Sequence, residues 1–393
     1  MKLLHTSDWH VGKGLRGADR GEEHRQVLAE IAGIAEREAV DVVVVAGDLF
    51  DSAAPAPEAE QIVYDALLAL ARSGAHVAVI AGNHDNPRRL RAVAPLLALG
   101  RVHVVAEPAR PDEGGVLELG LRGGAELRLA MLPFVSKRGI VRAEALMDRP
   151  AFELAQLYSD RMRRLLEAIT ASFRADTVNV LAAHAFVLAG HAAEHEGVGG
   201  GGERQAHLVE EYAVPGAAFP AAAGYVALGH LHRAQRIPGS GRLHYCGSPL
   251  QLDFGETAQT KQVNVAVLEP GVPAVVEPVP LAAGRRLRTV VGDEDELAAM
   301  AALANDDDWL RVIVRDAPRA GLAAAVQEWF GGRAVDVRVE STLATVRPAR
   351  VDHRTRSPQA LFGDFLASRG EGDERVRALF HDLLEEQLEA TGP

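Results

Sequence analysis

Seven short apolar runs constrain the fold of this chain more than any other feature of the sequence. Several are nearly pure Val, Ile, Leu and Ala, without the polar alternation of a strand that has one wet face. Such runs suit strands that are buried on both faces, in a sheet covered by helices. The runs are Lys2–His5, Asp41–Ala46, His76–Ala81, Val102–Val105, Leu127–Leu132, Asn179–Ala183 and Tyr225–Leu228.

Amphipathic stretches separate these runs and predict helices. Pro57 and Pro87 stand where a proline fits the first helical turn, and Asn86 is a suitable cap before Pro87. Strand and helix in repeated succession predict a layered α/β fold. The predicted helices span Glu22–Ala39, Pro57–Ser73, Pro87–Leu99 and Ala151–Ser172.

The chain divides into three parts on composition. Pro278, Pro280 and Gly284 indicate a linker between residues 1–280 and a small α/β domain at 285–345. Residues 346–393 form a tail: a basic stretch without periodicity, then amphipathic helices at Pro358–Ser368 and Glu374–Glu389. A mobile loop is expected at Gly197–Gly202. In the small domain we expect strands at Leu287–Val291, Leu310–Arg315 and Val335–Glu340 and helices at Glu294–Ala304 and Leu322–Phe330.

Composition excludes several classes of protein. The 42 Lys and Arg against 54 Asp and Glu leave a net charge of -12, the wrong sign for coating nucleic acid by bulk charge. Cys246 is the one cysteine, so a disulfide framework and a thiolate zinc cluster are excluded. No apolar run approaches the ~20 residues of a membrane span, and residues 1–8 lack the pattern of a secretory leader. We expect a cytoplasmic protein with no membrane contact.

Residue types that commonly bind metals follow five of the seven apolar runs. Open α/β sheets place their sites at the carboxyl ends of strands, so strands sharing one sheet would bring the five clusters together. A lone histidine is more often a core or surface residue, but Gly-Asn-His-Asp is expected by chance in about one chain in a thousand. The clusters are Asp8-Trp9-His10, Gly47-Asp48-Leu49-Phe50-Asp51, Gly82-Asn83-His84-Asp85, His184 and Gly229-His230-Leu231-His232.

The chemistry of these clusters narrows the metal. Carboxylate, imidazole and carboxamide donors without a thiolate suit Mn, Fe or Zn. Seven candidates are too many for one ion with an open position, and they fit two ions about 3.5–4 Å apart. We expect Asp48 to bridge the ions, because it stands alone at its strand end. The seven are Asp8, His10, Asp48, Asn83, His184, His230 and His232.

These clusters match, in order, the five motifs of the calcineurin-like metallophosphoesterases. The opening Thr6–Gly12 and the segment from Gly247-Ser248-Pro249-Leu250-Gln251 through Phe254-Gly255-Glu256 resemble, more narrowly, the SbcD family of bacterial nuclease subunits. The resemblance covers nearly the whole chain. It implies a layered β-sandwich flanked by helices, a small α/β cap domain that binds DNA, and a helical tail.

The resemblance also implies a division of the ligands between two ions, usually manganese. One ion would take Asp8, His10, Asp48 and His232, and the other Asp48, Asn83, His184 and His230. His84 resembles the catalytic histidine of the family, which stabilises the transition state or protonates the leaving oxygen. Asp85 either orients His84 or caps a helix, and Asp51 either bonds a site residue or shapes its loop. His191 and His195 are expected to be solvated loop residues.

The implied activity is that of a Mn-dependent DNA nuclease: a 3'-5' exonuclease on duplex ends and an endonuclease on single strands and hairpins. The family acts in DNA repair, recombination and replication with SbcC, a partner ATPase that binds the ATP, as a homodimer within a heterotetramer. Helices 57–73 and 87–99 would form the dimer contact, with ordinary core packing as the alternative. Two other hypotheses stay open: a phosphodiesterase for cyclic nucleotides or small diesters, and a binding scaffold that has lost the chemistry.

Contacts with DNA and with the partner are expected in the tail. The basic stretch either touches DNA phosphates or is a solvated linker, and the apolar residues of the two tail helices would grip the coiled-coil base of SbcC. The basic residues are Arg347, Arg350, Arg354 and Arg356. The partner-binding residues are Leu361, Phe362, Phe365, Leu379, Phe380 and Leu383, with Leu366 and Leu384 beside them.

Overall fold

The computed structural model describes residues 1–120, 124–136, 151–188, 213–303 and 307–340, without the side chains of residues 151–155 and 188. Six tail residues are also described: Phe362, Leu366, Arg375, Val376, Leu379 and Phe380. The chain forms two units, Met1–Glu340 and Ser341–Pro393. Each is considered by itself.

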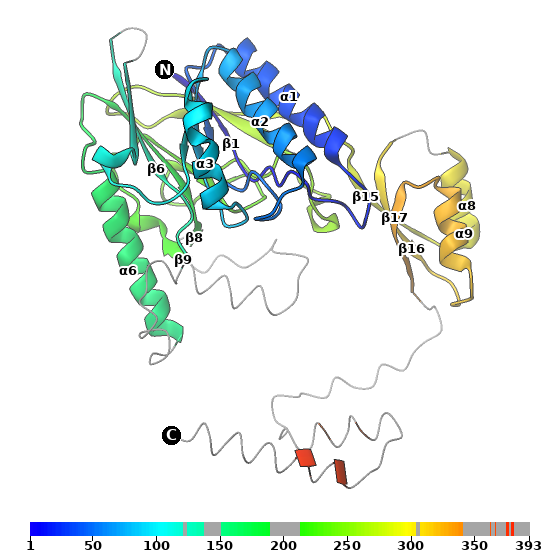
Figure 1. Ribbon diagram of the computed structural model, residues 1–393. Coiled ribbons are helices and arrows are strands. Elements are labelled where there is room, and N and C mark those ends of the chain that lie inside the picture. Colours follow the sequence, from blue (N-terminus) through cyan, green and yellow to red (C-terminus); the bar gives the residue numbers. More distant parts are fainter. Residues whose placement is uncertain are drawn as a thin grey trace. The chain divides into compact units, whose positions relative to one another are not determined.

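Two six-stranded sheets make up most of the first unit (Figure 1). The first sheet has the order β14-β13-β1-β2-β3-β4, with β1 to β4 parallel and β13 and β14 antiparallel at one edge. Its strands are β1 (Lys2–Thr6), β2 (Val42–Val45), β3 (His76–Ile80), β4 (Val102–Val105), β13 (Gln262–Val267) and β14 (Val275–Pro280).

The second sheet has the order β11-β12-β10-β7-β6-β5. Its four inner strands are parallel, and each edge strand is antiparallel to its neighbour. Its strands are β5 (Val116–Gly120), β6 (Glu126–Leu132), β7 (Val178–His184), β10 (Tyr225–Gly229), β11 (Gln235–Arg236) and β12 (Leu243–Tyr245).

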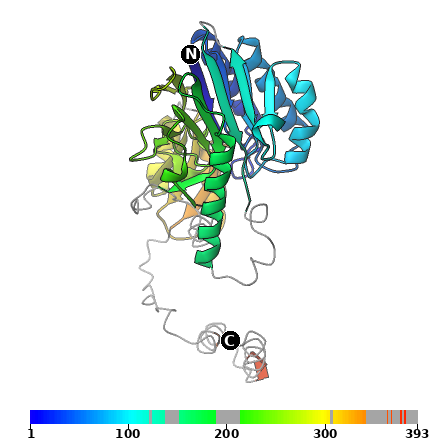
Figure 2. The same ribbon diagram turned by 90° about the vertical axis from the view of Figure 1, so that its left-hand side faces the viewer.

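The two sheets pack face to face, and helices cover their outer faces. Successive residues of one strand enter different cores: Val44 packs between the sheets, whereas Val43 and Val45 pack under helices. The helices α1 (Gly21–Arg37), α2 (Pro57–Arg72) and α3 (Pro87–Ala98) cover the first sheet, and α6 (Ala151–Ile169) packs on the second (Figure 2). This arrangement confirms the predicted α/β sandwich and explains why the strands lack polar alternation.

The strands and helices predicted before residue 341 are confirmed to within a few residues, with one correction, and the predicted tail helices lie almost wholly outside the described residues. The seven apolar runs lie in two stacked sheets, which agrees with the layered β-sandwich expected from the resemblance. The proposed linker begins too early, because Pro278 and Pro280 belong to β14. An edge strand tolerates proline, since one side of its backbone needs no ladder hydrogen bond.

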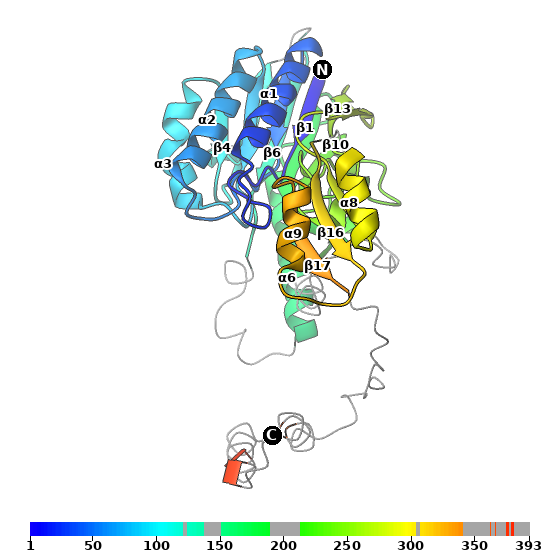
Figure 3. The same ribbon diagram turned by 90° about the vertical axis from the view of Figure 1, so that its right-hand side faces the viewer.

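A small three-stranded parallel sheet follows the sandwich (Figure 3). Its strands β15 (Leu287–Gly292), β16 (Trp309–Val314) and β17 (Ala334–Val339) and helices α8 (Glu294–Leu303) and α9 (Leu322–Trp329) lie where the sequence predicts them. They enclose a separate core that includes Leu310, Val312 and Val326. The second face of the sheet meets the sandwich through Leu287 and Trp309, which pack with Leu15 and Phe254.

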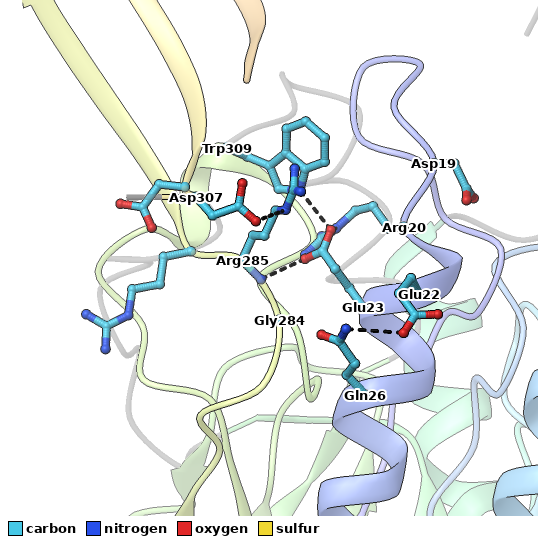
Figure 4. Close-up of a pocket in the computed structure, with 11 residues that line it drawn as sticks. Asp19, Arg20, Glu22, Glu23, Gln26, Gly284, Arg285, Asp307 and Trp309 are labelled. Atoms are coloured by element: carbon cyan, nitrogen blue, oxygen red, sulfur yellow. Dashed lines mark hydrogen bonds and ion pairs between the residues drawn. The ribbon is translucent and has the colours of Figure 1, made fainter. Parts of the chain in front are cut away.

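The carboxylate of Glu23 fastens this contact (Figure 4). It accepts hydrogen bonds from the Trp309 indole at 2.7 Å and the Arg285 backbone N–H at 2.9 Å, and it forms a buried ion pair with Arg20. The guanidinium of Arg285 lies 4.5 Å from the centre of the Trp309 ring. The small sheet is therefore tied to the start of α1 by a charged network as well as by apolar packing.

Short elements complete the described chain. Strands β8 (Phe186–Leu188) and β9 (Ala213–Pro215) pair in parallel, and 3-10 turns occur at η1 (Pro111–Glu113), η2 (Gly216–Ala218) and η3 (Phe254–Glu256). None of the helices searched in the described residues is both long and apolar enough to cross a membrane. The Gly197–Gly202 loop, His191 and His195 lie outside the described residues.

Candidate metal centre

The ends of five strands bring the predicted ligands to one place. The loops after β1 and β2 run side by side, with backbone hydrogen bonds from Asp8 to Gly47 and from His10 to Asp48. The loop after β10 joins them, because the His230 N–H donates to Asp8 Oδ1 at 2.9 Å. The two sheets end at the same side of the sandwich, so the clusters meet although they come from different sheets.

Four of these residues have left-handed backbone conformations. The φ angles are 53° at Asp8, 46° at His10, 51° at Asp48 and 105° at His230. Such a conformation costs an L-residue on the order of 1–2 kcal/mol, and strained residues of this kind concentrate at functional sites. The packing of the sandwich holds the four side chains in directions that an ordinary loop would not give them.

Glycines at the strand ends allow the loops to approach closely. A Cβ on Gly82 would lie 2.1 Å from Asp48 Oδ1, and one on Gly229 would lie 1.9 Å from the Ala46 carbonyl oxygen. Neither contact can be relieved by moving a flexible side-chain end, because Asp48 is buried and the second contact is with backbone. Both motif glycines are therefore required by the space around them.

The candidate ligands form two groups that share Asp48. In the first, His10 Nε2 lies 3.1 Å from His232 Nε2 and 3.5 Å from Asp48 Oδ2, and Asp8 offers an oxygen nearby. In the second, Asn83 Oδ1 lies 3.0 Å from His184 Nε2 and 2.9 Å from His230 Nδ1. The same Asp48 Oδ2 lies 3.4 Å from His184 Nε2, so one oxygen faces both groups.

The hydrogen bonds of the imidazoles fit a metal centre. His184 Nδ1 is 2.8 Å from the Ala46 carbonyl oxygen, which can only accept, so Nδ1 carries a proton and Nε2 is the nitrogen that faces the other candidate ligands. His232 has the same arrangement, with Nδ1 beside a carboxylate. Metal-binding histidines commonly donate their second N–H to such an oxygen. The donors therefore suit a divalent ion of the Mn, Fe or Zn type.

Charge in the site also favours a cation. The carboxylates of Asp8 and Asp48 are buried. Burial alone would lower the pKa of His184, but the charge of Asp48 outweighs it and raises that pKa to about 9. Burial likewise opposes the charged form of Asp48, yet His184 and His10 hold its pKa far below the usual value. A divalent cation bound between these groups would offset the buried carboxylates in place of a proton on His184.

His84 lies beside the groups with one nitrogen engaged. Its Nδ1 donates to the Asp51 carbonyl oxygen at 2.8 Å, and its backbone N–H donates to Asp48 Oδ1 at 2.9 Å. The ring meets that of His10 edge to face, with centres 4.7 Å apart. The orientation of the half-buried His84 imidazole is thus fixed beside His10 and Asp48.

The structure gives Asp85 a role other than the two expected ones. Its buried carboxylate accepts from the backbone N–H groups of Leu49, Phe50 and Gly82 at 2.8–3.3 Å, which ties the loop after β3 to the loop after β2. Burial raises the pKa of Asp85 to about 6. Helix α3 is capped instead by Asn86, as predicted.

Asp51 contacts the site directly. Its Oδ1 lies 3.0 Å from Lys13 Nζ and 3.5 Å from His10 Nδ1. The nearby His10 imidazole, helped by Lys13, lowers the pKa of Asp51 to about 2. Of the two roles considered for Asp51, the contacts agree with bonding to a site residue.

Three residues near the ligands were given no role from the sequence. Glu256 Oε1 lies 3.1 Å from His232 Nδ1, and its other oxygen is paired with Lys261 Nζ at 2.8 Å. Phe134 stacks on His230 with ring centres 6.3 Å apart. The sequence offered a clue to two of these residues. Glu256 belongs to the segment that carries the family resemblance, and Phe134 follows the end of a strand, β6, as the predicted ligands do.

The structure describes only part of the predicted tail contacts. Arg347, Arg350, Arg354 and Arg356 lie outside the described residues, as do Leu361, Phe365 and Leu383. Within the second unit the rings of Phe362 and Phe380 stack with centres 4.0 Å apart, so the two tail segments contact each other. The Leu379 side chain is largely exposed there.

Comparison with known proteins shows which families this chain resembles. Residues 1–234 match the calcineurin-like phosphoesterase family, and residues 283–369 match a family described as type 5 capsule protein repressor C-terminal domain. The SbcD subunit of the SbcCD nuclease from Bacillus subtilis is 37% identical over 298 residues, which cover 73% of this chain and 71% of that protein. The corresponding protein from Rhodobacter capsulatus is 36% identical over 293 residues, covering 71% and 69%.

A solved structure of a dimetal phosphatase from Danio rerio covers 71% of this chain and 99% of its own, at 12% identity and a TM-score of 0.38. That likeness is too low to add to the argument.

Proposed function

The chain belongs to the calcineurin-like phosphoesterases and, within them, to the SbcD family of nuclease subunits, and on this basis we propose that it is a metal-dependent DNA nuclease. The observation that carries the proposal is the position of Asp48. Its buried Oδ2 faces an imidazole of each ligand group, at 3.5 and 3.4 Å. A shared carboxylate between two groups is what a two-ion phosphoesterase needs.

In this proposal the centre holds two divalent ions, most suitably Mn²⁺. Asp8, His10, Asp48 and His232 would hold the first, and Asp48, Asn83, His184 and His230 the second. The contacts of the two groups support this division, because each set of atoms lies close together and Asp48 Oδ2 reaches both. When bound, such ions neutralise phosphate charge and supply a hydroxide nucleophile at neutral pH.

The residues of the chain have separate tasks in the hydrolysis of a phosphodiester. The seven ligands would hold the ions, which would position the scissile phosphate for in-line attack. His84 is held by Asp51 through Nδ1, which directs its Nε2 away from that bond; with a second proton on Nε2, the ring would stabilise charge on the phosphate or donate that proton to the leaving oxygen. Asp85 acts at a distance from the substrate, by fixing the backbone of two loops that carry ligands.

DNA is a suitable substrate despite the acidic chain. The bulk charge of -12 repels a polyanion, but two divalent ions bring four positive charges to a site with two ligand carboxylates. We propose that this local excess holds the backbone of the DNA, and that Arg347, Arg350, Arg354 and Arg356 and the small domain at 285–345 add contacts. In this proposal the protein cuts duplex ends, single strands and hairpins.

We propose further that the protein works with SbcC in the cytoplasm, as a homodimer within a heterotetramer. The names of the relatives support the partner, since both are subunits of a nuclease called SbcCD. The tail helices are the proposed site of SbcC binding. On α3 and just after it, Leu96 and Leu99 are 71% and 86% exposed, which favours α2 and α3 as the dimer contact over ordinary core packing.

The experiment is cleavage of end-labelled linear duplex and hairpin DNA with Mn²⁺, run beside a small chromogenic diester. Asp48→Ala and His84→Ala serve as controls. The proposal predicts cleavage of DNA that both substitutions abolish. Turnover of the small diester alone, unchanged after SbcC and ATP are added, would contradict a DNA nuclease and indicate a phosphodiesterase for small substrates.

A further inference from the structure

His232 is held at both ends of the residue by one buried ion pair. Glu256 Oε1 lies 3.1 Å from the imidazole Nδ1, and Lys261 Nζ donates to the His232 carbonyl oxygen at 3.0 Å. Glu256 and Lys261 are themselves paired at 2.8 Å, and their side chains are 12% and 8% exposed. The imidazole and the backbone of this residue are therefore fixed by the same two partners.

The bond to Glu256 decides which nitrogen of His232 can bind a metal. A carboxylate accepts, so Nδ1 carries the proton and Nε2 keeps its lone pair. That Nε2 lies 3.1 Å from His10 Nε2, in the first ligand group. Rotation of the ring or a change of tautomer would remove this donor from the group.

Lys261 holds the pair in place through further bonds. Its ammonium also donates to Ser248 Oγ at 2.9 Å and to Gln259 Oε1 at 2.8 Å. Glu256 Oε2 accepts a third hydrogen bond, from the Leu252 N–H at 3.0 Å. The Glu256 carboxylate is thus oriented by hydrogen bonds from Lys261 and Leu252 as well as by its contact with His232.

The loop that carries Glu256 is closed by a single side chain. Gln251 Nε2 donates to the carbonyl oxygens of Glu256, Thr257 and Gln259 at 3.1–3.2 Å. Its Oε1 accepts from the Leu287 N–H at 2.7 Å, at the first strand of the small sheet. The position of Glu256 is therefore set before any ligand arrives.

We propose that Glu256, anchored by Lys261, is the positioning residue that fixes the tautomer and direction of His232 and thereby sets the affinity of the first metal ion. This rests on the proposed two-ion centre. A buried ion pair often adds little stability compared with apolar residues of similar size. Apolar residues in place of Glu256 and Lys261 could not make the hydrogen bonds that these two residues make with His232. The second ion, held by residues that do not touch the pair, is unaffected.

The test is Mn²⁺ binding to the full chain, followed by the electron paramagnetic resonance of free Mn²⁺, for wild type, Glu256→Gln and Glu256→Ala. Loss of an outer partner of a metal-binding histidine commonly weakens binding about 10–100-fold. We expect a loss of that size at one of two sites for Glu256→Ala, and a smaller loss for Glu256→Gln, whose amide oxygen still accepts from Nδ1. Unchanged affinity at both sites in Glu256→Ala would overturn the proposal.

A matched control separates this role from a general loss of stability. Asp336→Asn removes the charge of another carboxylate, 13% exposed and paired with Arg311 at 2.7 Å in the small sheet. It is expected to leave both Mn²⁺ affinities unchanged. Equal losses in Asp336→Asn and Glu256→Gln would show that the pair acts only through stability, and would contradict the proposal.

The tautomer of His232 gives a readout that needs no metal. Imidazole ¹⁵N shifts of the metal-free protein are expected to show Nδ1 protonated in wild type and a mixture of tautomers in Glu256→Ala or, where that variant does not fold, Lys261→Met. The same tautomer in the folded variants would overturn the inference and leave the nuclease intact. Absence of Mn²⁺ binding to wild type would instead contradict the two-ion centre itself.

Discussion

Several residues of the site have geometries that their own preferences disfavour. Asp8, His10 and Asp48 adopt left-handed backbone angles of 46–53°, and carboxylates are buried beside one another. Single-residue preferences predict neither feature. The packing of the surrounding sandwich imposes these geometries, and as a result the donor atoms already face a common centre.

His84→Ala tests the separation of binding from chemistry. Because the contacts place His84 beside the ligand groups, with one nitrogen engaged by Asp51, we expect a fall in kcat of about 10²–10⁴-fold with Mn²⁺ affinity within a few-fold of wild type. The measurement is turnover of a small diester together with a Mn²⁺ titration. A loss of metal equal to that of Asp48→Ala would assign His84 to the ligands instead.

Acid stability depends on His24, a buried residue of α1. Burial lowers the pKa of His24 to about 4. Between pH 6.5 and 4 the unfolded chain therefore binds a proton that the folded chain does not. As the pH is lowered through this range, His24 reduces the free energy of unfolding by about 3 kcal/mol. Urea unfolding of wild type and His24→Gln at pH 7 and pH 4.5 checks this. An identical pH dependence in both proteins would refute it.

Elements were predictable from the sequence where their pattern is strong. Buried parallel strands such as β2 and β3 are continuous apolar runs, and α2 and α3 begin at a proline. The edge strand β4 was predicted, whereas the edge strands β5, β11 and β14 were missed because they are short, exposed or, like β14, contain proline. The division of the strands between two sheets could not be predicted, since it depends on pairing between segments far apart in the chain.

Gly82→Ala tests the close approach of two strand ends. The added Cβ would lie 2.1 Å from Asp48 Oδ1, so we expect Mn²⁺ affinity and diester turnover to fall at least about tenfold, with a lower melting temperature. Gly120→Ala in β5 is the control, because a Cβ there meets no atom within 4 Å. Normal metal binding in Gly82→Ala would show that Asp48 can move without cost.

At the scale of the molecule, the metal centre is assembled from segments as distant as Asp8 and His232. The sequence supplied the candidate ligands, since each follows an apolar run, and the resemblance supplied their grouping. Glu256 and Phe134 could not be assigned because their roles depend on contacts with His232 and His230, which only the folded chain shows. The same holds for Asp85, whose partners are backbone groups of distant loops.

Dimer formation is tested on the exposed apolar residues of α3. Replacement of Leu96 and Leu99 by Asp places two charges on the proposed contact and is expected to convert a dimer into a monomer. Light scattering at micromolar concentration measures the mass. A monomeric wild type would count against the dimer.

The tail is tested by deletion of residues 347–393. We expect the shortened chain to lose binding to SbcC and to hydrolyse a small diester at the wild-type rate, because the ligands all lie in the first unit. Co-purification with SbcC and a diester assay give the two readouts. A complex that survives the deletion would place the partner contact elsewhere.

The most direct test of the two-ion centre is the anomalous diffraction of crystals grown with Mn²⁺. We predict two peaks about 3.5–4 Å apart with Asp48 between them, one near His10 and His232 and the other near Asn83 and His184. In crystals of Asp48→Ala both peaks should weaken or disappear. A single ion, or ions bound away from Asp48, would contradict the account.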